Sequence, residues 1–272
     1  MRYLRLVTIL IFVAACALLG WTLYQVSLMD TVSPQITDSV GELHLQAAAD
    51  DTALMEGLTA TDDRDGDLTD RIMVERISRF SQLGVCQVSY VVFDTAHNFC
   101  RYQRTVIYDD YVSPRVQLTQ PLMYRLGEQI SIMDRIRLYD CLDGDITYAL
   151  KLESSNVPDN TVGVYEIELR ATNYYGDEIY AKIPLNIGNY SADAPQIQLT
   201  EYLAYTRVGD DFSPLDYVES VTDRTGASSP VDQLKVISQV DLSKPGGGQI
   251  CFEATDERGV TGVSCLTVIV ED

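Results

Sequence analysis

The stretch GVCQVSYVVFD at residues 84–94 has an apolar side chain at every second position between a glycine and an aspartate. Side chains that alternate in this way point to opposite faces of an extended chain, so the stretch predicts a β-strand with one buried face. The pattern returns as GVYEIELRATN at 163–173 and, one step shorter, as GQICFEATD at 248–256. Each copy is followed by a turn and a second apolar run, RTVIYDD, AKIPLNIGN and LTVIVED. The sequence therefore predicts the same β-hairpin three times.

Similar motifs also mark the start of each copy: SPQI at 33–36, SPRVQLT at 113–119 and APQIQLT at 194–200. Their prolines are 80 and 81 residues apart, so most of the chain is a threefold repeat. Short strands separated by Gly, Asp and Pro, without a helical pattern between them, predict an all-β fold of tandem sandwiches. Very short linkers predict a semi-rigid rod. The predicted domains span residues 30–110, 111–190 and 191–272.

An acidic turn lies between these motifs in two copies, as DDRDGDLT at 62–69 and DCLDGDIT at 140–147. The third copy has TDRTGASS at 222–229 and keeps only Asp223 and Gly226 of this signature. Together with the proline start and the terminal hairpin, the motifs resemble the bacterial immunoglobulin-like repeat that was first named from insecticidal crystal proteins and is common in surface proteins of Gram-positive bacteria. The resemblance implies three tandem immunoglobulin-like sandwiches, the third degenerate, with functions that are mostly structural or adhesive.

The N-terminal segment LVTILIFVAACALLGWTLY at 6–24 contains no charged residue. A helix of this length rises about 28 Å, close to the thickness of the hydrocarbon core of a membrane. Arg2 and Arg5 precede it, which predicts a cytoplasmic N-terminus and an extracytoplasmic remainder of the chain. We expect an uncleaved, single-pass anchor at 1–29 in a bacterial cell membrane. The alternatives are a cleaved signal peptide and, through the VAAC that ends at Cys16, a lipoprotein acylated on that cysteine.

Acidic residues dominate the chain beyond this segment. All 40 aspartates and glutamates lie at or after Asp30, whereas Arg2 and Arg5 are among the 20 basic residues. Such a charge repels nucleic acid and anionic lipid head groups, and favours metal ions, cationic partners or simple solubility. We therefore expect no nucleic-acid partner. The expected partners are the membrane, through the N-terminal helix, and an unidentified envelope protein or polysaccharide.

One of the six cysteines lies in the apolar segment and the others lie beyond it. A turn near residue 258 places Cys251 and Cys265 opposite each other on adjacent strands, which predicts a disulfide in an oxidising exterior. The same register in the first copy puts Cys100 opposite residue 92 and not opposite Cys86. We therefore interpret Cys86 as a core thiol, and a bridge from it to Cys141 between the first two domains is the alternative.

The acidic turns raise the question of a calcium site, because calcium prefers about six to eight oxygen ligands. A single loop fails the helix-loop-helix calcium pattern, since Thr61 and Ile72 would occupy its first and last ligand positions. An ion at the junction of the first two domains is one hypothesis, with the linker completing the acidic turn. Its expected ligands are Asp109, Asp110, Asp140, Asp143 and Asp145. The alternative is that Asp-Gly-Asp supplies only turn hydrogen bonds and a positive φ at glycine.

Motifs for catalysis are missing from the sequence. His44 and His97 are the only histidines, and neither lies in a recognisable nucleophile or zinc motif. We interpret the HN of TAHN as a turn and the glycine run at 246–248 as a loop. The sequence thus predicts a non-catalytic, membrane-anchored surface protein without a cofactor that serves as a spacer, adhesion or assembly module. A calcium-dependent envelope sensor, with ions at the junction of the first two domains, is the alternative.

Overall fold

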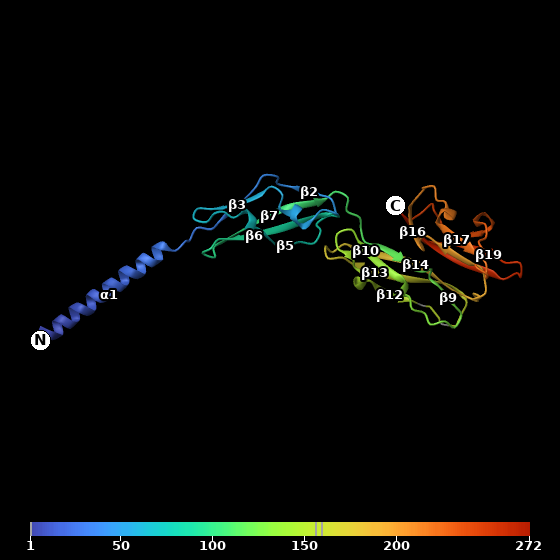
Figure 1. The fold of residues 1–272 in the computed structure, drawn as a ribbon, viewed down its shortest axis with the longest axis horizontal. Coiled ribbons are helices and arrows are strands. Elements are labelled where there is room, and N and C mark those ends of the chain that lie inside the picture. Colours follow the sequence, from blue (N-terminus) through green and yellow to red (C-terminus); the bar gives the residue numbers. More distant parts are fainter. Residues whose placement is uncertain (1, 156, 159) are drawn as a thin grey trace. The chain divides into compact units, whose positions relative to one another are not determined.

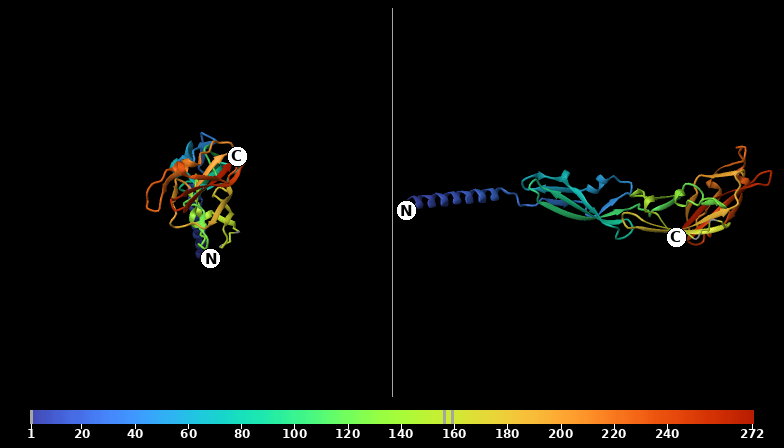
Figure 2. Two further views of the ribbon diagram at one scale, coloured as in Figure 1. Left: turned by 90° about the vertical axis from the view of Figure 1, so that its right-hand side faces the viewer. Right: turned by 90° about the horizontal axis from the view of Figure 1, so that it is seen from below.

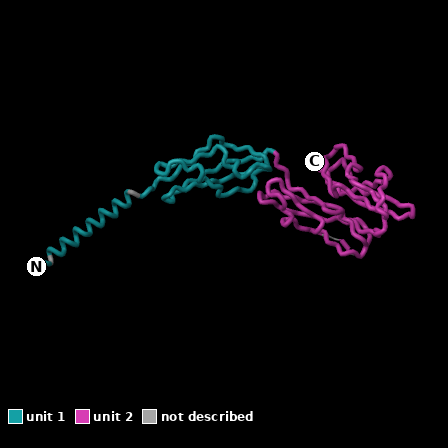
Figure 3. The backbone as a smooth tube through the Cα atoms, viewed as in Figure 1, with its two compact units in different colours: residues 1–109 teal, residues 110–272 magenta. Residues whose placement is uncertain are grey.

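The computed structural model describes residues 2–155, 157–158 and 160–272. One N-terminal helix is followed by strands that form three pairs of sheets (Figure 1). The predicted fold class, tandem β-sandwiches after an apolar helix, is confirmed. The contacts divide the chain into two compact units, 1–109 and 110–272 (Figure 3). The second of these units contains two of the three sheet pairs.

Helix α1 spans Arg2–Leu28 without interruption (Figure 2). It is about one turn longer at each end than the helix expected at 6–24, because neither flank contains a proline or glycine that would stop it. The 23 residues Arg5–Ser27 are long and apolar enough to cross a membrane. Their apolar side chains, among them Phe12, are exposed on the protein. The helix therefore presents an apolar surface that the rest of the described chain does not cover.

The first sandwich occupies residues 35–108. Its two sheets have the strand orders β1-β3-β4 and β2-β7-β6-β5. Strand β2 runs parallel to β7, and the other neighbouring strands are antiparallel. The first two strands thus lie in different sheets, each at an edge. The elements are β1 Gln35–Asp38, β2 Leu43–Leu45, η1 Asp51–Met55, β3 Leu58–Asp62, β4 Gly66–Asp67, η2 Thr69–Arg71, β5 Met73–Ile77, β6 Val85–Phe93 and β7 Phe99–Tyr108.

The second sandwich, at residues 115–188, repeats this plan. Its sheets have the orders β11-β10-β8 and β12-β13-β14-β9, with β9 parallel to β14. The same topology follows from the same motifs 80 residues further along the chain. The elements are β8 Arg115–Leu118, β9 Met123–Arg125, η3 Met133–Arg135, β10 Ile136–Asp140, β11 Gly144–Asp145, η4 Thr147–Ala149, β12 Lys151–Ser155, β13 Gly163–Thr172 and β14 Glu178–Gly188.

The third sandwich, at residues 196–271, has a smaller first sheet. Its orders are β15-β17 and β16-β20-β19-β18, with β16 parallel to β20. At the degenerate acidic turn, an isolated bridge between Thr222 and Ser228 stands where the other two sandwiches have a short strand. The elements are β15 Gln196–Leu199, β16 Leu203–Arg207, η5 Pro214–Tyr217, β17 Val218–Thr222, η6 Val231–Gln233, β18 Lys235–Ser238, β19 Gly246–Thr255 and β20 Thr261–Glu271.

The alternating residues of the repeated hairpin form the cores of the sandwiches. In β6, the side chains of Cys86, Val88, Tyr90 and Val92 are fully buried. The corresponding strands β13 and β19 bury their alternate residues in the same way. Burial of one such side chain stabilises the fold by about 1.5–3 kcal/mol, so the period-two pattern fixes which face of each strand turns inward.

The hairpin registers agree with the sequence analysis. Cys251 pairs with Cys265 and the two form the predicted disulfide, with Cα atoms 4.0 Å apart. In the first sandwich Val92 pairs with Cys100, so the turn lies where the third copy predicts it. The disulfide and the apolar helix together indicate an extracytoplasmic location.

The remaining described cysteines are free thiols. The alternative bridge from Cys86 to Cys141 would join the two compact units and stays a prediction. Cys86 faces the core opposite Val106. Burial raises the pKa of its thiol to about 11, which keeps it protonated and unreactive. The Cys141 sulfur donates a hydrogen bond to the carbonyl oxygen of Val112 at 3.2 Å.

The glycine run at 246–248 is the start of strand β19, and the interpretation as a loop is wrong. A Cβ atom added to Gly247 would lie 2.1 Å from the carbonyl oxygen of Lys182 in β14. One added to Gly248 would lie 2.8 Å from the Cα atom of Val240. Glycine is therefore needed at these positions, because β19 passes the backbone of Lys182 and Val240 too closely for any side chain.

Candidate functional site

The acidic turn has the same hydrogen bonds in the first two sandwiches. Asp62 Oδ1 accepts hydrogen bonds from the main-chain N of Arg64 at 3.0 Å and of Asp65 at 2.9 Å. Asp140 Oδ1 accepts two equivalent bonds, from residues 142 and 143, both at 2.8 Å. The glycine of the motif has a φ of +75° at Gly66 and +72° at Gly144. The alternative interpretation of the motif, a turn with a positive φ at glycine, is confirmed.

The threonine that closes the motif explains its remaining residues. Thr69 Oγ1 accepts a hydrogen bond from the main-chain N of Ala60, and its own N donates to Asp67 Oδ1 at 2.9 Å. Thr147 does the same with Leu138 and Asp145. The bonds from threonine lower the pKa of both aspartates. Asp-Gly-Asp-x-Thr thus joins the turn to strand β3 or β10.

Five aspartates were predicted to bind an ion at the junction. The contacts described here for these aspartates are with protein groups of the same compact unit. Asp109 Oδ1 lies 2.8 Å from His44 Nδ1. Asp143 Oδ2 accepts a hydrogen bond from the main-chain N of Tyr174 at 3.0 Å, and burial raises the pKa of this carboxyl. Asp110 has a partner as well. A joint site for these residues stays a prediction.

A different group of carboxylates is gathered in the first sandwich. Asp30 precedes β1, Asp62 ends β3 and Asp94 follows β6, and an oxygen of each lies within 4.8 Å of the others. Asp94 is 6% exposed, and the side chain of Asp30 is 9% exposed. Asp62 is partly exposed as a residue, but its Oδ2 atom is buried and has no hydrogen-bond partner. Neither Asp30 nor Asp94 was singled out as a ligand from the sequence.

The equivalent place in the second sandwich holds a hydrogen-bonded network of an amide, a tyrosine hydroxyl and two carboxylates. Asn173, which aligns with Asp94, donates from Nδ2 to Asp140 Oδ2 and to the hydroxyl of Tyr111, both at 2.9 Å. The Tyr111 hydroxyl donates to Asp177 Oδ2 at 2.9 Å. Burial and the bond to Asp177 raise the pKa of Tyr111, so it remains a donor. Here the aspartate at the turn has its second oxygen satisfied by an amide.

The third sandwich satisfies the same place with a cation. Asp256, which aligns with Asp94, accepts bonds from Arg258 Nε at 2.9 Å and from a terminal guanidinium nitrogen at 2.6 Å. That nitrogen also donates to the carbonyl oxygen of Asp193, ahead of β15, at 2.8 Å. An arginine thus connects the hairpin turn to the segment that enters the sandwich. At this place the second copy has the amide of Asn173 and the third has the guanidinium of Arg258. The first copy has the carboxylate of Asp94, next to the unsatisfied oxygen of Asp62.

A second feature is the contact between the second and third sandwiches, which belong to one compact unit. Asn186 in β14 and Gln249 in β19 exchange two hydrogen bonds, at 2.6 and 3.2 Å, and both are buried. Arg115 forms an ion pair with Glu271 at 3.1 Å. The close approach at Gly247 lies in the same contact. The paired amides satisfy each other, and a glycine without a side chain lets β14 and β19 approach closely.

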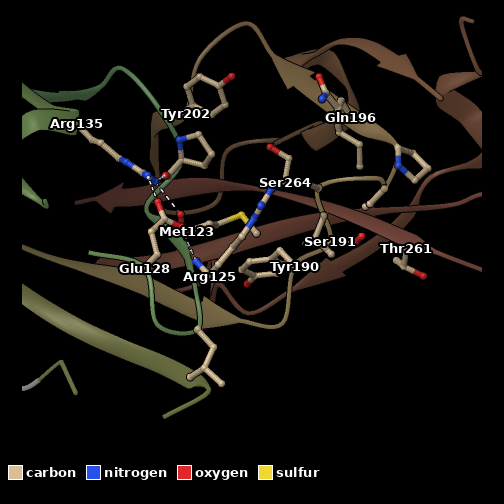
Figure 4. A pocket seen from close by; sticks show the side chains of 18 of the residues that line it. Met123, Arg125, Glu128, Arg135, Tyr190, Ser191, Gln196, Tyr202, Thr261 and Ser264 are labelled. Atoms are coloured by element: carbon tan, nitrogen blue, oxygen red, sulfur yellow. Dashed lines mark hydrogen bonds and ion pairs between the residues drawn. The ribbon is translucent and has the colours of Figure 1, made fainter. Parts of the chain in front are cut away.

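A groove of about 670 Å³ lies beside this contact (Figure 4). Arg135 borders it and donates to the carbonyl oxygens of Pro121 and Met123 at 2.8 and 2.7 Å. Figure 4 shows Arg125 and Tyr190 at the same groove. Its lining is a mixture of arginine, glutamate, tyrosine and serine side chains, which suits a polar ligand better than an apolar one.

The two histidines have structural positions. His97 has a φ of +72° in the β6–β7 turn, and its N donates to the carbonyl oxygen of Asp94 at 3.4 Å. The predicted turn at TAHN is therefore confirmed. His44 lies on β2 and contacts Asp109. Cys16, the candidate for lipidation, is an exposed free thiol on α1.

No family model matches the chain. The chain is 26% identical over 222 residues to the pesticidal crystal protein Cry22Aa of Bacillus thuringiensis, covering 78% of this chain and 29% of that protein. It is 24% identical over 112 residues to an uncharacterised 81.3 kDa protein of Acholeplasma phage L2, covering 39% of this chain and 15% of that protein. The chain thus spans less than a third of the length of these curated relatives. The distant similarity to a crystal protein agrees with the resemblance seen in the motifs.

Among solved structures, the chain is similar to the second carbohydrate-binding module and the INT domains of ZmpB from Clostridium perfringens. The identity is 17%, the TM-score is 0.25, and the match covers 55% of this chain and 26% of that chain. It is also similar to Drosophila N-cadherin EC1-3, at 11% identity and a TM-score of 0.30, over 85% of this chain and 98% of that chain. These likenesses concern tandem β-domains only.

Proposed function

We propose that the chain is a non-catalytic surface protein of a bacterial envelope, held in the membrane by α1, whose tandem sandwiches serve as a spacer, adhesion or assembly module. The observation that carries the proposal is the uncovered apolar surface of Arg5–Ser27 at the head of a chain of sandwiches. A helix of 23 residues rises about 34 Å, enough to cross the hydrocarbon core. The N-terminus lies in the cytoplasm and the sandwiches lie outside.

The structural use of the polar residues supports a role without catalysis. Arg135, Asn186 and Gln249 form hydrogen bonds with main-chain or side-chain partners inside the protein. The paired amides hold the second and third sandwiches in a fixed arrangement, which suits a spacer better than an enzyme. Its partner is an envelope protein or polysaccharide.

Membrane attachment is tested first, in cell fractions of the organism that expresses the full chain. An Ala14→Arg variant is expected to lose membrane retention, because a charge at the centre of a spanning helix costs about 2.5–3.5 kcal/mol on insertion scales. Gln25→Arg, near the end of α1, is the matched control and should remain in the membrane. Retention of both variants in equal amounts contradicts the anchor.

The alternative of a lipoprotein is tested by Cys16→Ser together with the intact mass of the extracted protein. The anchor proposal expects an uncleaved chain, an unmodified thiol and full membrane retention of the variant. Release of the variant and a mass that fits cleavage before Cys16 with added acyl chains would replace the anchor by a lipid. Protease added to intact cells should digest the sandwiches in either case, and full protection would contradict the surface location.

A further inference from the structure

The cluster of Asp30, Asp62 and Asp94 holds more negative charge than its protein neighbours neutralise. We propose that the first sandwich binds a divalent cation of the calcium type at these three carboxylates. This site differs from the predicted junction site, because none of its ligands belongs to that set. It also goes beyond a role as spacer, since it makes one sandwich responsive to an ion.

The spacing of the oxygens fits such an ion. One oxygen from each carboxylate lies within 4.8 Å of the other two. Calcium binds oxygens at about 2.3–2.6 Å, so two ligands of one ion lie at most about 5 Å apart. Three carboxylates leave about three or more coordination positions for water, which is common for calcium sites of moderate affinity.

The buried Oδ2 atom of Asp62 supplies an independent reason. Its partner Oδ1 caps the acidic turn, whereas Oδ2 has no donor and no access to solvent. A buried carboxylate oxygen without a donor is costly, and two further carboxylates beside it increase the cost. A cation bound among them satisfies all three groups at once.

The donors beside the cluster bind Asp30 and Asp94 and leave Asp62 Oδ2 without a partner. Asn98 donates from N and Nδ2 to Asp94, both at 2.7 Å, and to the carbonyl oxygen of Asp30 at 3.2 Å. Asp30 Oδ1 accepts from the main-chain N of Val32 at 3.0 Å. Arg64 is the nearby cation, and its half-exposed side chain forms an ion pair from Nε to Asp30 Oδ2 at 3.7 Å.

The other two sandwiches act as internal controls for this reasoning. In the second, Asn173 supplies an amide donor to Asp140 where the first has a third carboxylate. In the third, the guanidinium of Arg258 binds Asp256. Each copy that satisfies its aspartate from within the protein does so with an amide or a guanidinium, and among the described residues only the first copy has a buried carboxylate oxygen without a hydrogen-bond partner.

The location of the site gives the ion a definite effect. Asp30 follows the end of α1 by two residues, whereas Asp62 and Asp94 belong to turns of the sandwich. A bound ion therefore ties the segment after the helix to both turns. Removal of the ion frees that segment, so calcium is expected to control how firmly the first sandwich is held next to α1.

The direct test is isothermal titration calorimetry of the full chain in detergent micelles with calcium chloride. We expect saturable binding at calcium concentrations up to about 10 mM. Asp94→Asn copies the residue found in the second sandwich, and Asp62→Asn keeps an oxygen to cap the turn, so both variants should fold. Each is expected to weaken binding at least about tenfold, because calcium affinity depends on the charge of its ligands.

Asp63→Asn is the matched control, since it removes the same charge from the neighbouring exposed position and should bind as the unaltered chain does. Hydrogen exchange of the segment around Asp30 should slow on addition of calcium in the unaltered chain and in Asp63→Asn, but not in Asp94→Asn. The proposal is overturned if the full chain shows no calcium heat and no change in exchange. It is equally overturned if Asp94→Asn and Asp62→Asn bind calcium unchanged, or if Asp110→Asn alone abolishes binding.

Discussion

The first and second sandwiches share a topology and an acidic turn, but different groups surround the aspartate of that turn. In the second, Asn173 and Tyr111 donate to Asp140 and its neighbours. In the first, Asp94 stands in place of the asparagine and leaves Asp62 Oδ2 without a donor. The two copies carry an acid and an amide in opposite order, Asp94 and Asn98 in the first against Asn173 and Asp177 in the second, so that only the second places its amide beside the aspartate of the turn. Repeated domains can therefore keep a fold while the order of two side chains in one turn decides whether a buried carboxylate oxygen has a donor.

Asn173→Asp in the second sandwich is expected to have the largest effect on stability. It removes the donor to Asp140 and places a like charge beside it at a buried position. We expect a loss of about 3 kcal/mol in the free energy of unfolding at neutral pH. Hydrogen exchange of peptides from β13 and β14 measures the loss. Unchanged protection in these peptides would show that the network is not needed there.

Tyr111→Phe removes the hydroxyl from the same network and should have a smaller effect. The hydroxyl donates to Asp177 and accepts from Asn173, so its loss leaves polar groups partly unsatisfied. We expect a loss of about 1–2 kcal/mol, again by hydrogen exchange of the second sandwich. Tyr148→Phe, at an exposed tyrosine of the same sandwich, is the control and should change nothing measurable.

Asp94→Asn makes the first sandwich like the second and should act in the opposite direction. In calcium-free buffer it removes one of three neighbouring negative charges, and we expect a gain of about 1 kcal/mol in the free energy of unfolding. Chelator should then have no effect on the variant. Hydrogen exchange of β6 and β7 with and without chelator provides the measurement, because Trp21, the single tryptophan, lies in α1 and does not report on the sandwiches. A loss of stability in calcium-free buffer would show that the hydrogen bond from Asn98 Nδ2 to Asp94 outweighs the repulsion among the carboxylates.

The smallest effect concerns Asp65 and Asp143, which occupy the same position of the acidic turn in the two sandwiches. Hydrogen bonds from Thr95 N and Oγ1 lower the pKa of Asp65 below its ordinary value of 3.8. Burial raises the pKa of Asp143 above the same ordinary value. Titration followed by NMR of the carboxyl carbons should therefore give Asp65 the lower pKa of the two. The reverse order would refute the difference between the two environments.

The sign of each stability effect follows from linkage. Because the folded pKa of Asp65 is depressed, its contribution is present above pH 3.8 and is lost as the pH falls through the folded value. The raised pKa of Asp143 means that its ionisation opposes folding at neutral pH, and this penalty disappears as the pH falls below 3.8. Asp143→Asn should then stabilise the second sandwich at neutral pH but not at low pH.

Much of the fold could be predicted from local patterns. Alternation at 84–94 determines which residues face the core, and the copies at 163–173 and 248–256 show that the same hairpin recurs. Register transferred between copies also predicts the Cys251–Cys265 disulfide, because pairing across a tight turn depends only on the distance from its centre. The helix was predicted in place but too short, since composition indicates the apolar part and not where the hydrogen-bonding pattern ends.

The candidate site was harder to predict from the sequence than the fold. The signal that could have indicated it is the difference between aligned positions of the three copies. Asp94 aligns with Asn173 and Asp256, and Asp30 stands four residues before the first proline of the repeat. The acid-rich turn was predicted to supply ion ligands, but most of its carboxylates accept hydrogen bonds from the backbone of the turn itself. Gly247 was missed for a similar reason, because a glycine run has the same composition in a loop as at a close crossing of strands.

The repeat, the strand periodicity, the apolar helix and one disulfide can be read from the sequence, because each depends on residues near one another or on one register. Which carboxylates lie together depends on the folded arrangement. Asp30, Asp62 and Asp94 come from three segments far apart in the chain, and the sandwich brings them to one end of its sheets. The distance between their oxygens depends on the packing of both sheets, which no local pattern specifies.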